Sequence, residues 1–111
     1  MPLLNLDGKL ILVVEDDEMS FLYLKQLLIL THCKLLRAKS GSEALELFRV
    51  HPFDLILMDI QLPDMAGTTV TRMIRQSKAN IPILAQTAGK TGDAIAEAME
   101  AGCSAVLVKP F

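Results

Sequence analysis

Carboxylate side chains follow two apolar runs of the sequence, at the points where those runs end. Glu15 and Asp16 come directly after Leu10–Val14, and Asp59 comes directly after Leu55–Met58. Carboxylates brought together repel one another by about 4 kcal/mol per close pair at an effective dielectric constant near ~20. A cation must offset that repulsion, and Mg²⁺ binds carboxylates while leaving room for a phosphate oxygen. These acids therefore indicate a magnesium site, provided that the fold brings them together.

Two further side chains could act on an anion beside such a metal. Lys109 follows the apolar run Ala105–Val108 and supplies a fixed positive charge. Thr87 follows Ile81–Ala85 and supplies a hydroxyl. Together with the acids they indicate magnesium-assisted phosphoryl transfer, in which an Asp carboxylate such as Asp59 is the nucleophile. Each residue alone has a plainer explanation as a helix cap, a turn residue or a solvated charge, so only the combination points to chemistry.

Five short apolar runs must position these residues. The runs are continuous rather than alternating, as strands covered on both faces should be, and we expect them to form a parallel sheet. The predicted strands are Lys9–Val14, Leu35–Ala38, Leu55–Met58, Ile81–Ala85 and Ala105–Val108.

Helical patterns lie between the predicted strands. Ser40 and Glu43 have the spacing of a capping box at the start of the second helix. Thr91 is a candidate N-cap for the fourth helix, and Gly102 is its expected stop. The predicted helices are Glu18–Thr31, Ser42–His51, Thr68–Ser77 and Asp93–Ala101.

This alternation predicts a doubly wound α/β domain, a five-stranded parallel sheet with helices on both faces. In such a fold ligands bind at the carboxyl ends of the strands, which is where the candidate residues lie. Only Lys109-Pro110-Phe111 follows the fifth strand, so the helix expected to cover that part of the sheet has no sequence to form it. We expect residues 1–8 to be a linker or the remnant of a neighbouring segment, and residues 9–111 to be the domain without its fifth helix.

Length and charge narrow the possible classes of protein. The 111 residues fit one domain, and 51% of them are hydrophobic, which excludes a disordered chain. Lys plus Arg is 11 against 13 for Asp plus Glu, so no surplus of basic residues is available to bind nucleic acid directly. The apolar runs are too short to span a membrane. Cys33 and Cys103 are expected to be reduced thiols, as in a cytoplasmic domain.

Four motifs in this order resemble those of the response-regulator receiver domain of two-component systems, and they span nearly the whole chain. The resemblance implies the flavodoxin-like strand order 2-1-3-4-5, a bound Mg²⁺ and phosphorylation on an aspartate. The motifs are Ile11–Glu18, Leu57–Gly67, Ala85–Ala88 and Val108–Phe111.

The resemblance also assigns roles to single residues. It implies that Asp16 binds Mg²⁺ directly, that Glu15 acts through water, and that the backbone carbonyl of Gln61 is a further ligand. Asp59 would be both a metal ligand and the phosphoacceptor. Lys109 would pair with the phosphoryl group.

Other positions would shape the switch and the lifetime of the phosphate. Thr87 would move to hydrogen-bond the phosphoryl group, and Pro63 and Gly67 match the loop after the acceptor. Gln61 and Gly89 stand where receivers tune phosphate lifetime, and a small Gly89 leaves water free access, which implies modest persistence. Val106 departs from the family, because many receivers have an aromatic residue there whose ring moves on activation.

The resemblance implies a phosphoacceptor that assists its own phosphorylation and dephosphorylation rather than an enzyme acting on outside substrates. Its partner would be a histidine kinase or a histidine phosphotransfer domain, and a homodimer stays open. The Ala85–Ala88 motif is similar to that of receivers fused to sensor kinases, so a cytoplasmic part of a hybrid kinase is expected, with a stand-alone regulator as the alternative. An aspartate-nucleophile phosphatase is less favoured, because its second Asp is replaced by Gln61. A metal-independent interaction module is the remaining competitor.

Overall fold

A parallel five-stranded sheet forms the centre of the molecule. The computed structural model describes residues 5–77, 79–88 and 92–109. The strands are hydrogen-bonded in the order β2-β1-β3-β4-β5, and every pair is parallel. The predicted strand order and fold class are therefore confirmed. The elements are β1 Leu10–Val14, α1 Glu18–Ile29, β2 Lys34–Ala38, α2 Gly41–Val50, β3 Leu55–Asp59, α3 Gly67–Gln76, β4 Ile83–Thr87, α4 Gly92–Ala101 and β5 Ala105–Val108.

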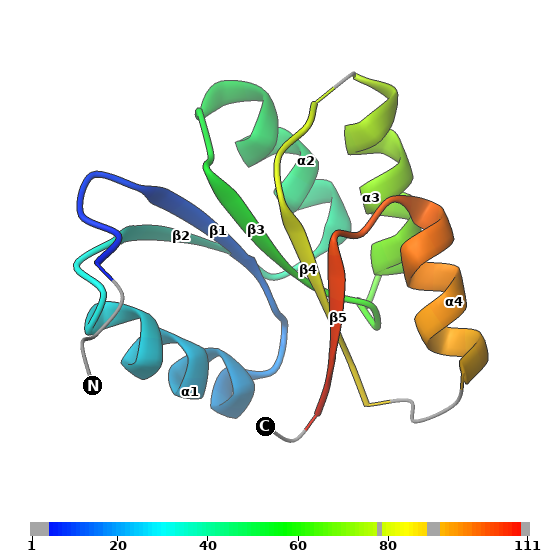
Figure 1. Ribbon diagram of the computed structural model, residues 1–111, viewed down its shortest axis with the longest axis horizontal. Coiled ribbons are helices and arrows are strands. Elements are labelled where there is room, and N and C mark those ends of the chain that lie inside the picture. Colours follow the sequence, from blue (N-terminus) through cyan, green and yellow to red (C-terminus); the bar gives the residue numbers. More distant parts are fainter. Residues whose placement is uncertain (1–4, 78, 89–91, 110–111) are drawn as a thin grey trace.

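Helices cover both faces of the sheet, unevenly. Helix α1 lies alone on one face, whereas α2, α3 and α4 cover the other (Figure 1). The side chains of Ile11, Val13 and Leu57 pack under α1 in a small cluster. A larger cluster around Leu12, Val14, Ile56, Met58, Val70 and Ile74 packs under the other three helices. No described residue after β5 is helical, and Leu107 of β5 is 42% exposed.

The boundaries of β4 differ from the prediction. We expected Ile81–Ala85, but the strand runs from Ile83 to Thr87. Proline has no N–H to donate to a sheet ladder, so Pro82 does not continue the strand. The carbonyl of Ile81 instead accepts a hydrogen bond from Nη1 of Arg75 at 2.7 Å. The shift makes Thr87 the last residue of the strand rather than a residue of the loop after it.

Side chains fix the starts of the first two helices. Asp17 caps α1 by accepting a hydrogen bond from the Ser20 backbone at 2.8 Å. Ser40 caps α2 by accepting from the Glu43 backbone at 3.1 Å, as predicted, although the Glu43 carboxylate reaches back to the N–H of Lys39 rather than to that of Ser40.

The ends of the helices agree less evenly with the predictions. Helix α1 ends at Ile29, two residues earlier than expected, and His32 in the following turn has a positive φ of 64°. Gly102 follows α4 with φ 113°, as expected of a helix stop. Thr91, the candidate cap of α4, lies outside the described residues. Cys33 and Cys103 are free thiols, as expected. None of the described helices is long and apolar enough to cross a membrane.

Candidate metal centre

Three carboxylates meet at the carboxyl end of the sheet. Glu15 directly follows β1, Asp16 lies in the next position, and Asp59 is the last residue of neighbouring β3. One carboxylate oxygen from each lies within 4.8 Å of the others. Glu15 is fully buried and Asp59 is 5% exposed, whereas Asp16 is exposed. The fold thus brings together the three acids that the sequence singled out.

Lys109 contacts two of the three acids. Its Nζ lies 2.7 Å from Oε1 of Glu15 and 3.5 Å from Oδ2 of Asp59. Burial raises the pKa of Glu15, and the contact with Asp59 raises it further, while Lys109 acts in the opposite direction. Burial alone would lower the pKa of Lys109, but its hydrogen bond to Glu15 and the charges of both acids outweigh that effect and raise it. One ammonium cannot neutralise three ionised carboxylates.

The donor set fits Mg²⁺. All three side chains offer oxygen, two of them are held by the ends of adjacent strands, and exposed Asp16 leaves the cluster open to solvent. Hard divalent cations select such ligands, and Mg²⁺ retains waters on the open side. Bound Mg²⁺ would supply the positive charge that the cluster lacks and would hold a phosphoryl oxygen beside Asp59.

Hydrogen bonds tie the loop after β3 to the end of that strand. The N–H of Gln61 donates to Oδ1 of Asp59 at 3.0 Å, and Gln61 forms a β-bridge with Ala66. The N–H of Gly67 donates to the carbonyl of Ile60 at 2.8 Å. A Cβ at Gly67 would overlap the backbone carbonyl oxygen of Asp59, so glycine is required for this close approach. Pro63 lies exposed in the same loop.

Thr87 is the last residue of β4, and Lys109 directly follows the neighbouring strand β5. The N–H of Lys109 donates to the carbonyl of Thr87 at 2.7 Å, and Thr87 is 2% exposed. Gln86, one residue earlier, pairs with Asp59, which places Thr87 next to the acceptor strand at the same edge of the sheet. Val106 pairs with Ala85 and packs, partly buried, against the larger cluster. Gly89 lies outside the described residues.

Two residues beside the site were missed from the sequence. Asp64 accepts hydrogen bonds from the N–H groups of Gly41 at 2.8 Å and Ser42 at 2.9 Å, which joins the loop after β3 to the start of α2. These bonds lower the pKa of Asp64 to about 2. Arg37 of β2 donates from Nε to the carbonyl of Glu15 at 3.0 Å. A signal for Arg37 was present, since it is a charged residue inside a strand that was expected to be covered on both faces.

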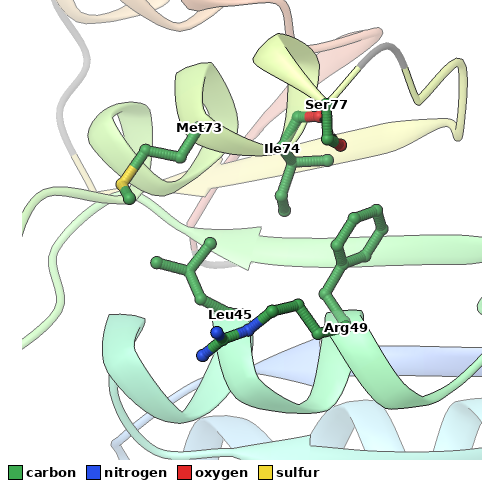
Figure 2. A pocket seen from close by; sticks show the side chains of 6 residues that line it. Leu45, Arg49, Met73, Ile74 and Ser77 are labelled. Carbon is green, nitrogen blue, oxygen red and sulfur yellow. Dashed lines mark hydrogen bonds between the residues drawn. The ribbon is translucent and has the colours of Figure 1, made fainter.

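A separate hollow of about 490 Å³ lies between α2 and α3. Leu45 and Arg49 of α2 face Met73 and Ile74 of α3 across it, with Ser77 at one end (Figure 2). None of its lining residues belongs to the acidic cluster, so this hollow is not part of the candidate metal centre.

The amino-acid sequence is similar to those of known proteins. The sequence model of the response regulator receiver domain matches residues 11–111. A curated relative, the polar-differentiation response regulator DivK of Brucella ovis, is 36% identical over 105 residues, which cover 93% of this chain and 85% of the relative.

Solved structures of similar fold include a two-component response regulator and the receiver domain of a sensor histidine kinase. A two-component response regulator from Clostridium difficile superposes with a TM-score of 0.89 at 27% identity, covering 94% of this chain and 85% of that one. The receiver domain of a sensor histidine kinase from Pseudomonas aeruginosa superposes with a TM-score of 0.85 at 32% identity, covering 94% and 87%. That receiver has a magnesium ion coordinated in its active-site cleft.

Proposed function

This chain belongs to the response regulator receiver family, and from that membership we propose that it accepts a phosphoryl group on Asp59 with the help of Mg²⁺. One observation carries the proposal. The oxygens of Glu15, Asp16 and Asp59 lie within 4.8 Å of one another, while Lys109 contacts the first and last of them. A structural role alone does not require buried acids to converge, because their repulsion has to be offset.

In the transfer step a carboxylate oxygen of Asp59 attacks the phosphorus of a phosphohistidine. The new O–P bond replaces the P–N bond, and the imidazole leaves with the electron pair and takes a proton from solvent. Gln61 N–H holds one oxygen of Asp59 at 3.0 Å, which leaves the other oxygen, Oδ2, as the attacking atom. Lys109 lies 3.5 Å from that oxygen and is placed to balance the charge of the arriving phosphoryl group.

We propose the remaining roles on the same basis. Asp16 is a direct metal ligand, Glu15 acts through water, and the carbonyl of Gln61 completes the protein ligands. The buried position of Glu15 and its contact with Lys109 support an indirect role, since its Oε1 is already engaged. Thr87 moves toward the phosphoryl group once it is bound, because three new acceptor oxygens attract its hydroxyl.

Val106 and the loop positions modulate this switch. A small β-branched side chain at Val106 has little rotational reach, so coupling to the edge of β5 differs from that in receivers with an aromatic ring there. Pro63 and Gly67 shape the loop that holds Gln61, and by its residue type Gly89 has no side chain to restrict the access of water to a phosphoryl group. The last point predicts a modest phosphate lifetime.

The partner we propose is a histidine kinase or a histidine phosphotransfer domain in the cytoplasm. The relatives support both a stand-alone regulator and a receiver within a sensor kinase, because each kind is among the similar proteins. In either setting the domain acts as an acceptor rather than as an enzyme for outside substrates. An aspartate-nucleophile phosphatase would need an acid at Gln61, whose side chain cannot exchange a proton.

Magnesium titration followed by beryllofluoride binding tests the proposal. Beryllofluoride with Mg²⁺ imitates the phosphoryl group, so we expect the amide spectrum to shift around Asp59, Thr87 and Lys109 in the wild type and not in Asp59→Asn. Omission of Mg²⁺ should abolish the shift. A wild-type spectrum that changes with neither Mg²⁺ nor beryllofluoride would instead favour the metal-independent interaction module.

A further inference from the structure

Arg37 joins the edge strand β2 to the loop that carries the acids. Its Nε donates to the carbonyl of Glu15 at 3.0 Å, and its Nη1 pairs with Glu18 at 2.8 Å. The guanidinium carbon lies 4.2 Å from the centre of the Phe21 ring. The side chain is only 13% exposed, so it is held in one place by groups on three sides.

The carbonyl that Arg37 holds belongs to the peptide between Glu15 and Asp16. On the other side of Glu15, its N–H donates to the carbonyl of Ala38 at 3.0 Å. Neighbouring residues of β2 therefore fix both backbone groups of Glu15. Because the peptide that leaves Glu15 sets where the next Cα lies, these contacts also set the position of Asp16.

Asp16 depends on its backbone more than the other two acids do. Glu15 is anchored by Lys109 at 2.7 Å, and Asp59 by the N–H of Gln61 at 3.0 Å. Among the residues that the structure describes, none donates a hydrogen bond to the Asp16 side chain. A ligand that no side-chain contact restrains is placed by the peptides on either side of it.

The contacts of Arg37 exceed what a surface ion pair would need. Glu18 is 63% exposed, and a pair with so exposed a partner contributes little stability. Nη2 of Arg37 is buried and has no hydrogen-bond partner among the described residues, whereas a solvated arginine would keep all of its nitrogens wet. The geometry favours the Nε contact with the Glu15 carbonyl over solvation of the guanidinium.

We propose that Arg37 is a positioning residue that tightens Mg²⁺ binding by fixing the Glu15–Asp16 peptide. The inference rests on the proposed magnesium site. Positioning and charge predict opposite changes in Mg²⁺ affinity when Arg37 is removed. Arg37 is a cation near the acids, so electrostatics alone would make its removal strengthen metal binding. The sign of the change in affinity therefore separates positioning from charge.

The test compares Arg37→Met with Lys39→Met. Methionine keeps an apolar stem over Phe21 but removes every donor. Lys39→Met makes the same change in charge beside the same partner, since Nζ of Lys39 lies 3.5 Å from Glu18, but it leaves the Glu15 carbonyl bonded. Dissociation constants for Mg²⁺ and Ca²⁺ are measured by calorimetry on the unphosphorylated chain, and folding is checked by urea denaturation.

We expect Arg37→Met to weaken Mg²⁺ binding roughly 10-fold, as loss of an outer-shell contact does. Ca²⁺, which tolerates irregular geometry, should weaken by about 3-fold or less. Lys39→Met should bind Mg²⁺ as tightly as the wild type or slightly more tightly. Arg37→Lys, which offers one nitrogen in place of the fork, should fall between, and it keeps the test available if Arg37→Met does not fold.

Three results would overturn the inference. Mg²⁺ affinity that is unchanged or stronger in a folded Arg37→Met would show that the contact does not position the ligand. Equal losses for Mg²⁺ and Ca²⁺ would show a general disturbance of the cluster. A wild type that binds no Mg²⁺ would refute the proposed function itself, and the role of Arg37 with it.

Discussion

The two loops that supply the carboxylates are held in different ways. The loop after β3 is held mainly by backbone contacts. Gly67 donates to Ile60 at 2.8 Å, Gln61 bridges to Ala66, and the close approach of Gly67 to Asp59 leaves no room for a side chain. The loop after β1 is held largely by side chains from other strands or their ends, Arg37 of β2 and Lys109 after β5.

Because the two parts are held differently, they should not tolerate change equally. Backbone contacts between residues near in sequence do not depend on charge, so the two ends of the loop after β3, next to Asp59, should keep their shape across pH and salt. The tip of the same loop, which the Asp64 carboxylate joins to α2, should respond to pH. Contacts made by charged side chains respond to both pH and salt. Asp59 therefore lies on the rigid side of the site, while Asp16 lies on the side that substitutions can adjust.

Gly67→Ala should disrupt the loop after β3 and cause the largest loss of stability. The new Cβ would overlap the backbone of Asp59 and Ile60, neither of which can turn aside as a flexible side chain could. We expect a loss of about 3 kcal/mol in the free energy of unfolding, measured by urea denaturation. Gly92→Ala is the matched control, because nothing lies within 4 Å of its Cβ position. Equal stability of the two variants would mean that the loop after β3 is not tightly held.

Lys109→Met acts on the loop after β1, which side chains hold, and it should destabilise the protein less than Gly67→Ala does. It leaves buried Glu15 without its cation, which should cost about 2 kcal/mol, less than a fully buried pair because Glu15 can take a proton. Without Lys109 the pKa of Glu15 rises further. A carboxyl whose folded pKa is raised destabilises the protein fully above that folded pKa and not at all below its ordinary pKa, so the deficit should shrink as pH falls between the two.

Saturating Mg²⁺ should restore more stability to Lys109→Met than it adds to the wild type, because the metal replaces the missing positive charge. Thermal unfolding with and without Mg²⁺ measures this difference. The same gain in stability in both proteins would mean that Mg²⁺ does not replace the charge of Lys109.

Asp64→Asn should have the smallest effect and a distinctive pH dependence. The hydrogen bonds from Gly41 and Ser42 lower the pKa of Asp64 to about 2. A carboxyl with a lowered folded pKa stabilises the protein above its ordinary pKa, and that contribution is lost as pH falls toward about 2. The stability difference between wild type and Asp64→Asn should therefore shrink between roughly pH 4 and pH 2. A difference that does not depend on pH in that range would mean that Asp64 holds α2 through shape rather than charge.

The sequence predicted the position of the site because parallel strands place their carboxyl ends at one edge. That rule places Glu15 and Asp59 at the same edge, and the structure places them at the ends of the adjacent strands β1 and β3. The apolar runs report where each strand ends, whereas the order of the strands came from the resemblance to receiver domains.

Contacts between distant elements could not be predicted in the same way. The bonds from Arg37 to Glu15 and from Asp64 to Gly41 join residues 22 and 23 positions apart, across neighbouring elements. They depend on how side chains cross the space between those elements, which no periodicity records. The start of β4 was predicted wrongly for a local reason, since the apolar run continues through Pro82, which has no N–H to donate to the ladder.

Transfer of a phosphoryl group to Asp59 is the central claim, and it can be measured directly. The wild type and Asp59→Asn are incubated with labelled acetyl phosphate and Mg²⁺, after both are shown to unfold at similar urea concentrations. We expect one acyl phosphate on the wild type, removed by hydroxylamine and absent when Mg²⁺ is chelated, and none on Asp59→Asn. Label that persists on Asp59→Asn would contradict the assignment of the acceptor.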